Sequence, residues 1–244
     1  MYEAEISRTS PSAFLFIIDQ SGSMEEQMET EQTKAQFVAD VLNKTLYQLI
    51  IRCTRADGVR NYFDVGVLGY GGDTVKSGFG GALSGSVLHP LSDIEANPLR
   101  IEERMKRVPD GAGGLVDQPT KFPVWFDPTS AGGTPMTAAM RTAAEAVVAW
   151  CDSHPSSYPP TIIHVTDGAS TDGDPSPVAD ALRQMSTSDG QCLLFNLHIS
   201  TAGGEKVVFP RPIRASIHTG GCYLACPARF LPTSCRSLRT RAIR

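Results

Sequence analysis

Five oxygen-bearing residues stand where apolar or helical segments of this sequence begin or end, and their types suit a hard metal ion. Asp19, Ser21 and Ser23 follow the apolar run "AFLFII" within the stretch "IIDQSGSM". Thr134 lies in "SAGGTPM" before a segment of helical pattern, and Asp167 closes a second apolar run, "TIIHVTDG". Hydroxyl and carboxylate oxygens are ligands that Mg²⁺ and Mn²⁺ accept. We therefore predict a divalent metal site at these residues.

Two other chemistries could use hydroxyls beside a glycine. A phosphate site would show G-x-x-x-x-G-K-[ST], which is absent, and "GFGGALSG" does not complete G-x-G-x-x-G. A nucleophilic serine would stand in a G-x-S-x-G elbow with a histidine base, whereas "DQSGS" differs and His164 lies inside an apolar run. We therefore expect a protein that is not an enzyme, with a metal-assisted phosphohydrolase as the catalytic alternative.

The elements that must position these residues alternate along the chain. Short apolar runs predict strands, and apolar residues at helical spacing predict helices. We expect strands over residues 12–19, 62–72, 159–168 and 191–200, helices over 30–53, 91–108, 134–154 and 174–190, and a hairpin or loop over 71–91. This alternation predicts an α/β fold with an open, mainly parallel central sheet flanked by helices, of Rossmann-like type.

Ligands of such sheets gather beyond the carboxyl ends of the strands. The predicted metal residues follow two strands and precede one helix, so we expect them to meet at one edge of the sheet. Asp19 and Ser21 could instead cap a helix, and Asp167 could belong to a simple turn. The joint occurrence of all three segments favours the metal site.

The segments "DQSGSM", "GGTPM" and "VTDG", in this order, resemble the metal-ion-dependent adhesion site of von Willebrand factor type A (VWA) domains. The resemblance implies a VWA fold in which Ser21, Ser23 and Thr134 are direct ligands of Mg²⁺ or Mn²⁺. It also implies that Asp19 and Asp167 act mainly through bound water. In that family, one open coordination position accepts an acidic side chain of a partner protein.

The resemblance covers roughly residues 12–200, and a small, solitary cytoplasmic chain of this kind resembles bacterial stand-alone VWA proteins. It implies a metal-dependent protein-binding module, with a place in an intracellular signalling or ATPase-linked assembly. A structural subunit with a degenerate metal site is the third alternative. No second folded domain or membrane anchor is expected from the sequence.

Composition bounds the possible partners and location. The 244 residues have a formal net charge of −4, which argues against a nucleic-acid-binding surface. The run "AFLFII" is too short to span a membrane and lacks the basic start of a signal peptide, so we expect a cytoplasmic protein with no membrane partner. Cys53, Cys151 and Cys192 lie in apolar segments, as reduced core cysteines do.

Composition sets apart an atypical tail rich in arginine and cysteine (211–244). For the rest of the chain, the resemblance implies an N-terminal arm (1–11) and a VWA domain (12–210). The tail has seven arginines, no lysine and no acidic residue. We favour its interpretation as an out-of-frame segment of a GC-rich gene. A basic arm is one alternative, and the other is a zinc site at His218, Cys222, Cys226 and Cys235.

Three further features have a structural and a functional interpretation. The segment "STDGDPSP" has acidic spacing reminiscent of a calcium loop, but we interpret it as a helix entry. His164 is expected to be a hydrogen-bonded core residue rather than a ligand. Trp125 could be an aromatic residue beside the site or a local packing residue.

Overall fold

A six-stranded sheet forms the centre of the molecule in the computed structural model, which describes residues 2–109, 111 and 114–201. Neighbouring strands follow the order β12-β9-β1-β4-β5, and β6 pairs with β4. The strands are β1 (Ser12–Asp19), β4 (Phe63–Gly71), β5 (Thr74–Ser77), β6 (Leu88–Pro90), β9 (Thr161–Thr166) and β12 (Leu193–His198).

Four neighbouring strands, β12, β9, β1 and β4, run parallel to one another, while β5 and β6 run antiparallel to β4. All residues of β1 are buried except Phe14, which is half-buried. A strand covered on both faces requires a continuous apolar run, which is what "AFLFII" supplies. The predicted α/β class, with a mainly parallel sheet flanked by helices, is confirmed.

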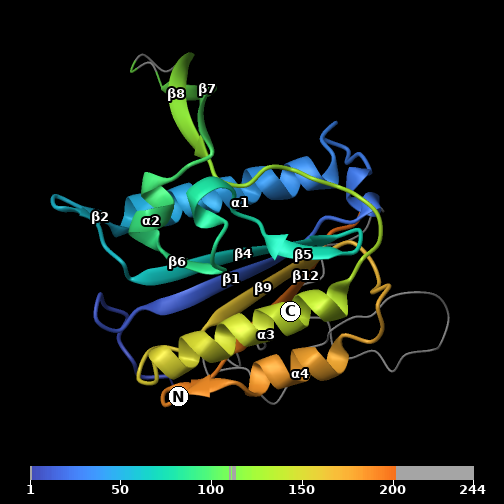
Figure 1. Cartoon of the computed structure of the whole chain (residues 1–244). Coiled ribbons are helices and arrows are strands. Elements are labelled where there is room, and N and C mark those ends of the chain that lie inside the picture. Colours follow the sequence, from blue (N-terminus) through green and yellow to red (C-terminus); the bar gives the residue numbers. More distant parts are fainter. Residues whose placement is uncertain (1, 110, 112–113, 202–244) are drawn as a thin grey trace, which may run out of the picture.

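Two layers of helices cover the sheet. Figure 1 shows α1 and α2 on one face and α3 and α4 on the other. The helix α1 begins after Thr33, whose side chain accepts a hydrogen bond from the backbone of Gln36 in a reciprocal capping box. The helices are α1 (Lys34–Cys53), α2 (Leu91–Ala96), α3 (Met136–Ser153) and α4 (Ser176–Gln184), with 3-10 turns η1 (Gly22–Glu25) and η2 (Gly81–Leu83).

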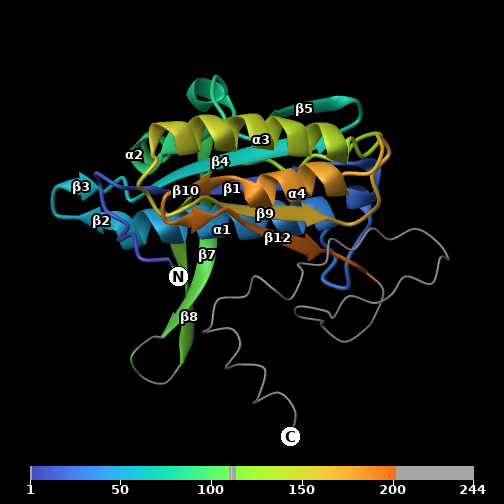
Figure 2. The same ribbon diagram turned by 90° about the horizontal axis from the view of Figure 1, so that it is seen from below.

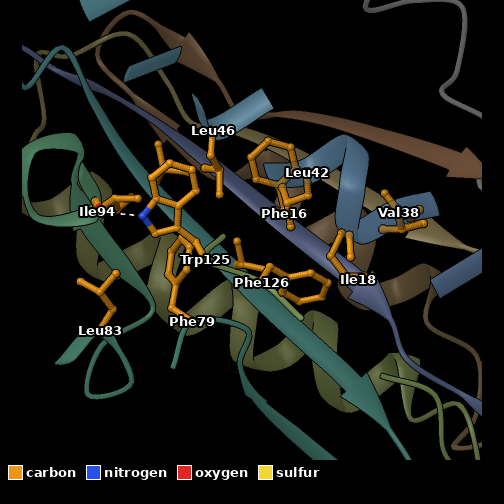
Figure 3. Packing of buried hydrophobic residues seen from close by; sticks show 14 of the residues in the cluster. Phe16, Ile18, Val38, Leu42, Leu46, Phe79, Leu83, Ile94, Trp125 and Phe126 are labelled. Carbon is orange, nitrogen blue, oxygen red and sulfur yellow. Dashed lines mark hydrogen bonds between the residues drawn. The ribbon is translucent and has the colours of Figure 1, made fainter. Parts of the chain in front are cut away.

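Each face of the sheet has its own hydrophobic core. The core beneath α1 contains Trp125, which packs near Phe16 and Phe126 in Figure 3. The indole is 2% exposed, and its Nε1 donates a hydrogen bond of 2.6 Å to the carbonyl of Ile94. The interpretation of Trp125 as a local packing residue is confirmed, and the alternative of an edge or interface aromatic beside the site is wrong.

The prediction of one helix over residues 91–108 is wrong beyond Ala96. Helix α2 ends there, and the strand β7 (Arg100–Pro109) follows. The residue before a proline is disfavoured in the helical conformation, so Pro98 makes a helix through Asn97 unfavourable. The helical pattern expected for the segment rested on its charged residues, which suit an exposed strand equally well.

Two other segments differ in detail. Residues 71–91, expected to form a hairpin or loop, contain β5 paired with β4, the turn η2 and the strand β6. The helix expected over 174–190 ends at Gln184 and is followed by the two-residue strands β10 (Ser186–Thr187) and β11 (Gly190–Gln191). The loop between these two strands is Ser188 and Asp189, followed by Gly190, and these residue types favour a turn over a helix. A similar short pair, β2 (Thr54–Arg55) and β3 (Gly58–Val59), follows α1.

A long hairpin leaves the body between α2 and α3. Its strands, β7 and β8 (Leu115–Val124), form a separate antiparallel two-stranded sheet. Figures 1 and 2 show that this hairpin, the arm, projects away from the body on the side that α1 covers. A prediction from apolar periodicity could not find it, because only the root of the hairpin is buried and the rest of its length is exposed or half-buried.

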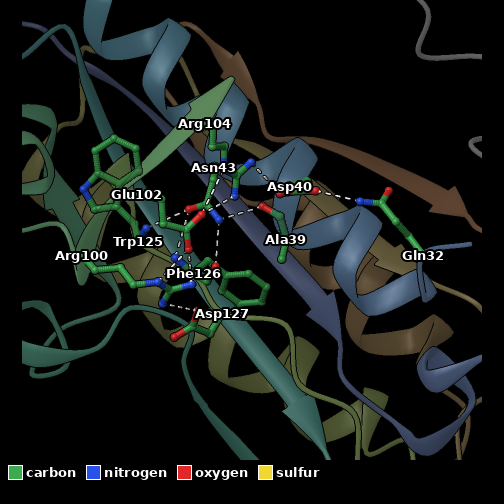
Figure 4. A network of polar contacts seen from close by, with 10 residues as sticks. All are labelled: Gln32, Ala39, Asp40, Asn43, Arg100, Glu102, Arg104, Trp125, Phe126 and Asp127. Atoms are coloured by element: carbon green, nitrogen blue, oxygen red, sulfur yellow. Dashed lines mark hydrogen bonds and ion pairs between the residues drawn. The ribbon is translucent and has the colours of Figure 1, made fainter. Parts of the chain in front are cut away.

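The root of the arm is fixed to α1 by the network in Figure 4. Arg104 lies with its guanidinium 4.0 Å above the ring of Phe122 and donates a 2.9 Å hydrogen bond to Asp40. Asn43 accepts hydrogen bonds from the backbone of Trp125 and Phe126 just after β8. The arm is therefore anchored at its base, while its outer half extends beyond these contacts.

The N-terminal residues contact the turn between β10 and β11. The backbone N–H groups of Glu3 and Ala4 donate to Asp189, and the Tyr2 hydroxyl donates to the carbonyl of Gln191. The domain limits stay a prediction, and the tail from residue 211, with the zinc alternative, lies outside the described residues. In the described part of the chain, no helix has the length and apolar character needed to cross a membrane. The three described cysteines are buried and free.

Candidate metal centre

The predicted metal residues lie at the carboxyl edge of the parallel sheet. β1 and β9 are direct neighbours, with Ile18 opposite Val165, so Asp19 and Asp167 leave the sheet side by side. The side chain of Asp167 is fully buried, and Asp19 is 1% exposed. Burying two carboxylates this close together is costly unless cations or hydrogen-bond donors compensate them.

A chain of hydrogen bonds links four of the five residues. The hydroxyls of Ser21 and Ser23 are 3.1 Å apart, and Ser23 donates a 2.7 Å hydrogen bond to Oδ1 of Asp167. Asp19 accepts a 2.9 Å hydrogen bond from the backbone N–H of Ser21 and a 2.7 Å bond from the hydroxyl of Thr166. The structure therefore brings the oxygens of these side chains together.

The loop that carries Thr134 reaches the same edge through the backbone of Ala131 and Gly132, while the backbone of Thr134 itself bonds to Thr171. The N–H of Gly22, between the two serines, donates a 3.0 Å hydrogen bond to the carbonyl of Gly132. The backbone of Ala131 donates to the carbonyl of Gln20, and the backbone of Gly72 donates to the carbonyl of Ala131. These bonds fix the loop that carries Thr134 between the ends of β1 and β4.

Two glycines allow this close approach of three backbones. Gly132 has φ +62°, and a Cβ there would lie 2.6 Å from the Cα of Gly72. A Cβ at Gly71 would lie 2.3 Å from the carbonyl oxygen of Gln20. Real Cβ atoms do not occupy such positions, so Gly71 and Gly132 are geometric requirements of the site.

A buried lysine completes the charge arrangement. Lys34, the first residue of α1, is 4% exposed; its Nζ lies 3.0 Å from Oδ2 of Asp167 and also donates to Glu26. Burial alone would lower the pKa of Lys34, but the hydrogen bonds to both carboxylates and their attraction outweigh it and raise the pKa. The hydrogen bond from Lys34 is the main cause that lowers the pKa of Glu26, and a hydrogen bond from Thr201 is the second cause. Lys34 is therefore a permanent cation beside the site.

Beneath the edge, a neutral polar network crosses the sheet. His164 is fully buried, with Nε2 at 2.7 Å from the hydroxyl of Tyr70 and Nδ1 at 2.8 Å from Oδ1 of Asn196. Burial lowers the pKa of His164 to about 4. Burial, with the negative charge of Asp19 next, raises the pKa of Tyr70. The prediction that His164 is a hydrogen-bonded core residue is confirmed.

The two acidic residues of "STDGDPSP", Asp172 and Asp174, accept hydrogen bonds at the N-terminal ends of two helices. Asp172 accepts hydrogen bonds from the backbone N–H groups of Thr137 and Ala138 in the first turn of α3. Asp174 accepts one from the backbone of Ser176, where α4 begins. Burial would raise the pKa of Asp172, but the hydrogen bonds it accepts lower it. The helix-entry interpretation is confirmed.

The donor set of the edge fits a hard divalent cation. Adjacent ligands of an octahedral Mg²⁺ ion, each about 2.1 Å from it, lie about 3 Å apart, close to the 3.1 Å between the two serine hydroxyls. Among the described residues, no group of three or more His, Cys, Asp or Glu side chains is placed to hold a metal. The predicted site is of another kind, because it combines three hydroxyls with only two carboxylates.

Sequence reasoning missed two contributors, Lys34 and Thr166. Thr166 stands directly before Asp167, and its inward position follows from the alternation of a strand that ends at the site. Lys34 occupies a buried position of an amphipathic helix, where a lysine needs a partner. That signal could have indicated a buried ion pair without naming Asp167.

Comparison with known proteins leaves the family of the chain open. No protein-family model matches it, and neither does any curated protein. One similar solved structure contains three N-terminal domains of the type V pili tip protein Mfa5 from Porphyromonas gingivalis, at 13% identity and a TM-score of 0.34. The match covers 66% of this chain and 20% of that chain, and a similarity this low supports no statement about fold or function.

Proposed function

We propose that this chain is a VWA-type domain that binds Mg²⁺ or Mn²⁺ and recognises an acidic side chain of a partner protein. Ser21, Ser23 and Thr134 would hold the ion directly, while Asp19 and Asp167 would act mainly through water. The observation that carries this proposal is the chain of hydrogen-bonded oxygens from Ser21 through Ser23 to Asp167 at the sheet edge. When bound, the ion supplies a coordination position for a carboxylate.

The charges of the buried groups favour an anionic partner. Asp19, Asp167 and Lys34 together carry one formal negative charge, so a divalent ion would make this buried set positive, and the exposed Glu26 that also pairs with Lys34 offsets part of that charge. Neutral hydroxyl ligands do not cancel that charge, and an incoming carboxylate is attracted to it. Ser23 is exposed, which gives a partner access to the site from solvent.

The environment of His164 supports binding rather than hydrolysis. Both of its ring nitrogens are engaged with other side chains, and it lies fully buried under the edge. A general base must reach the proton that it abstracts, and this imidazole faces the interior of the sheet. We therefore propose a recognition subunit without catalysis of its own, in the intracellular assembly that the VWA resemblance implies.

Thermal unfolding with and without metal tests the ion site. The wild-type chain should melt about 5 to 10 °C higher in Mg²⁺ at about 100 times the dissociation constant than in EDTA. Asp167→Asn should abolish this metal-dependent shift. Asp174→Asn, the same change seven residues further along at the start of α4, should retain it. An equal shift in both variants, or none in the wild type, would contradict the proposal.

Peptide selection tests the acidic partner. Peptides from a displayed library that bind in Mg²⁺ and are released by EDTA should contain an Asp or Glu that cannot be replaced by Asn or Gln. Thr134→Ala should lose the same peptides while retaining the fold, as judged by circular dichroism. Selected peptides that tolerate the amide replacement would refute carboxylate recognition and leave the ion site intact.

A further inference from the structure

One face of the arm exposes apolar side chains from its root to its tip. Paired residues of an antiparallel sheet share a face, and the faces alternate along each strand. The exposed fractions of Ile101, Met105 and Leu115, all on this face, are 61%, 67% and 66%. Five cross-strand pairs make up the outer face of the arm: Ile101–Pro123, Glu103–Lys121, Met105–Pro119, Arg107–Asp117 and Pro109–Leu115.

The opposite face is occupied at its root. It contains Phe122 and Val124, which are buried, and Arg104, which bonds to Asp40 of α1. The outer face therefore points away from α1. An isolated two-stranded hairpin is marginally stable in water, and exposed apolar side chains gathered on one face mark an interaction surface.

Charged pairs alternate with apolar pairs on the outer face, and their order is reversed between the two charged levels. Glu103 on β7 stands opposite Lys121 on β8, whereas Arg107 on β7 stands opposite Asp117 on β8, with Nε and Oδ1 3.6 Å apart. Met105 and its partner Pro119 separate the two levels. The four charges sum to zero, so the face does not select a strongly acidic or basic partner.

This pattern is complementary to itself. A two-fold axis that crosses the strands at the level of Met105 places Glu103 of one arm against Arg107 of the other. The same axis places Lys121 against Asp117, and Met105 against Met105. Every charge then faces an opposite charge, and apolar levels face apolar levels. The arms lie antiparallel in this arrangement, and their bodies are kept apart by the arm length of about 33 Å.

We propose that two copies of the chain associate through the outer faces of their arms, packed antiparallel around Met105. The interface is isologous and leaves the carboxyl edge of each sheet accessible. This inference does not depend on metal binding. A parallel arrangement of the arms would also pair opposite charges, but it would bring both bodies to the same end of the interface.

Sedimentation equilibrium of the full chain with exchanged charges tests the inference. The double exchange R107D/D117R preserves the opposite-charge pair within the hairpin. In the antiparallel dimer, however, it opposes acid to acid and base to base, so we expect the dimer to weaken at least tenfold. Adding E103K/K121E exchanges the second level as well, restores complementarity, and should restore the dimer.

Each alternative outcome is decisive. A wild-type chain that stays monomeric at about 100 µM would overturn the inference. So would a double exchange that dimerises as well as the wild type, because that result indicates parallel arms or another surface. The fourfold exchange guards against misfolding, since a folded chain that recovers dimerisation cannot have lost its arm. Circular dichroism melts of all three proteins provide the same check directly.

Discussion

The carboxyl edge of the sheet and the β7–β8 arm are two polar regions that are held in opposite ways. At the edge, Asp167 is bonded to Ser23 from the η1 turn and to Lys34 from α1, so distant segments meet on one carboxylate. In the outer arm, Arg107 meets Asp117 of the adjacent strand. The edge depends on the whole fold, whereas the outer arm depends on its own hairpin, so equal substitutions should have unequal effects in the two regions.

Adding a methyl group to a glycine should show the largest difference. Gly132→Ala should destabilise the chain by about 4 kcal/mol, because it adds a contact with the backbone of Gly72 to the cost of a positive φ. Gly111→Ala, at φ +80° near the arm tip with open space around it, should cost only about 1 kcal/mol. Urea unfolding of both variants measures the difference. Equal losses of stability in the two variants would mean that the backbone around Gly132 can shift to accommodate the methyl group.

Replacing a lysine should distinguish the buried cation of the edge from an exposed one. Lys34→Met should cost about 3 kcal/mol in EDTA, because it leaves the buried Asp167 without its cation. On the proposed function, Mg²⁺ should recover much of this loss. Lys44→Met, on the exposed side of the same helix, should change stability little in either buffer. Chemical unfolding with and without Mg²⁺ gives both comparisons, and a mild loss for Lys34→Met would contradict the assignment.

Acid should destabilise the edge through His164. Its pKa is about 4 in the folded chain and about 6.5 unfolded, so the unfolded chain binds the extra proton between these values. Stability is therefore lost as pH falls from about 6.5 to about 4, by about 3 kcal/mol in total. His164→Gln should lack this part of the pH dependence, and His154→Gln, at the end of α3, should keep it. Unfolding midpoints measured across this range decide between them.

The root and the outer half of the arm should differ modestly. Arg104→Ala should cost about 1 kcal/mol, since Arg104 contacts both Phe122 and Asp40. Arg107→Ala should change monomer stability by less than about 0.5 kcal/mol, because its contact with Asp117 is exposed. Thermal melts at a concentration where the chain is monomeric compare the two. A larger effect at Arg107 would contradict an outer arm independent of the body.

Shortening the arm should have the smallest effect on the body. Replacing residues 105–119 with Asn-Gly joins the paired residues Arg104 and Thr120 through a tight hairpin turn. The described residues of the removed part are exposed or half-buried, so we expect the monomer melting temperature to change by about 2 °C or less. The same deletion should abolish association through the arm. A shortened chain that unfolds would show that the body needs the outer arm.

The contrast between the regions also explains what the sequence could predict. The strands β1 and β9 and the helix α3 were predictable because burial forces continuous apolar runs or helical spacing on them. Where those elements end, polar residues at the carboxyl edge indicated a site. The arm was not predictable, because its strands are buried only at their root, and charged residues made part of it resemble a helix. Lys34 was missed because its partner is 133 residues away in the chain.

The ammonium of Lys34 bears on how the protein matures. A site made only of carboxylates would repel itself until an ion arrived, and a newly made chain would have to acquire metal in order to fold. Here Asp167 already has a counter-ion, the ammonium of Lys34, which belongs to α1 of the same chain. On the proposed function, the chain can therefore fold during synthesis at any metal supply, and the cellular concentration of the ion then regulates partner capture instead of protein abundance.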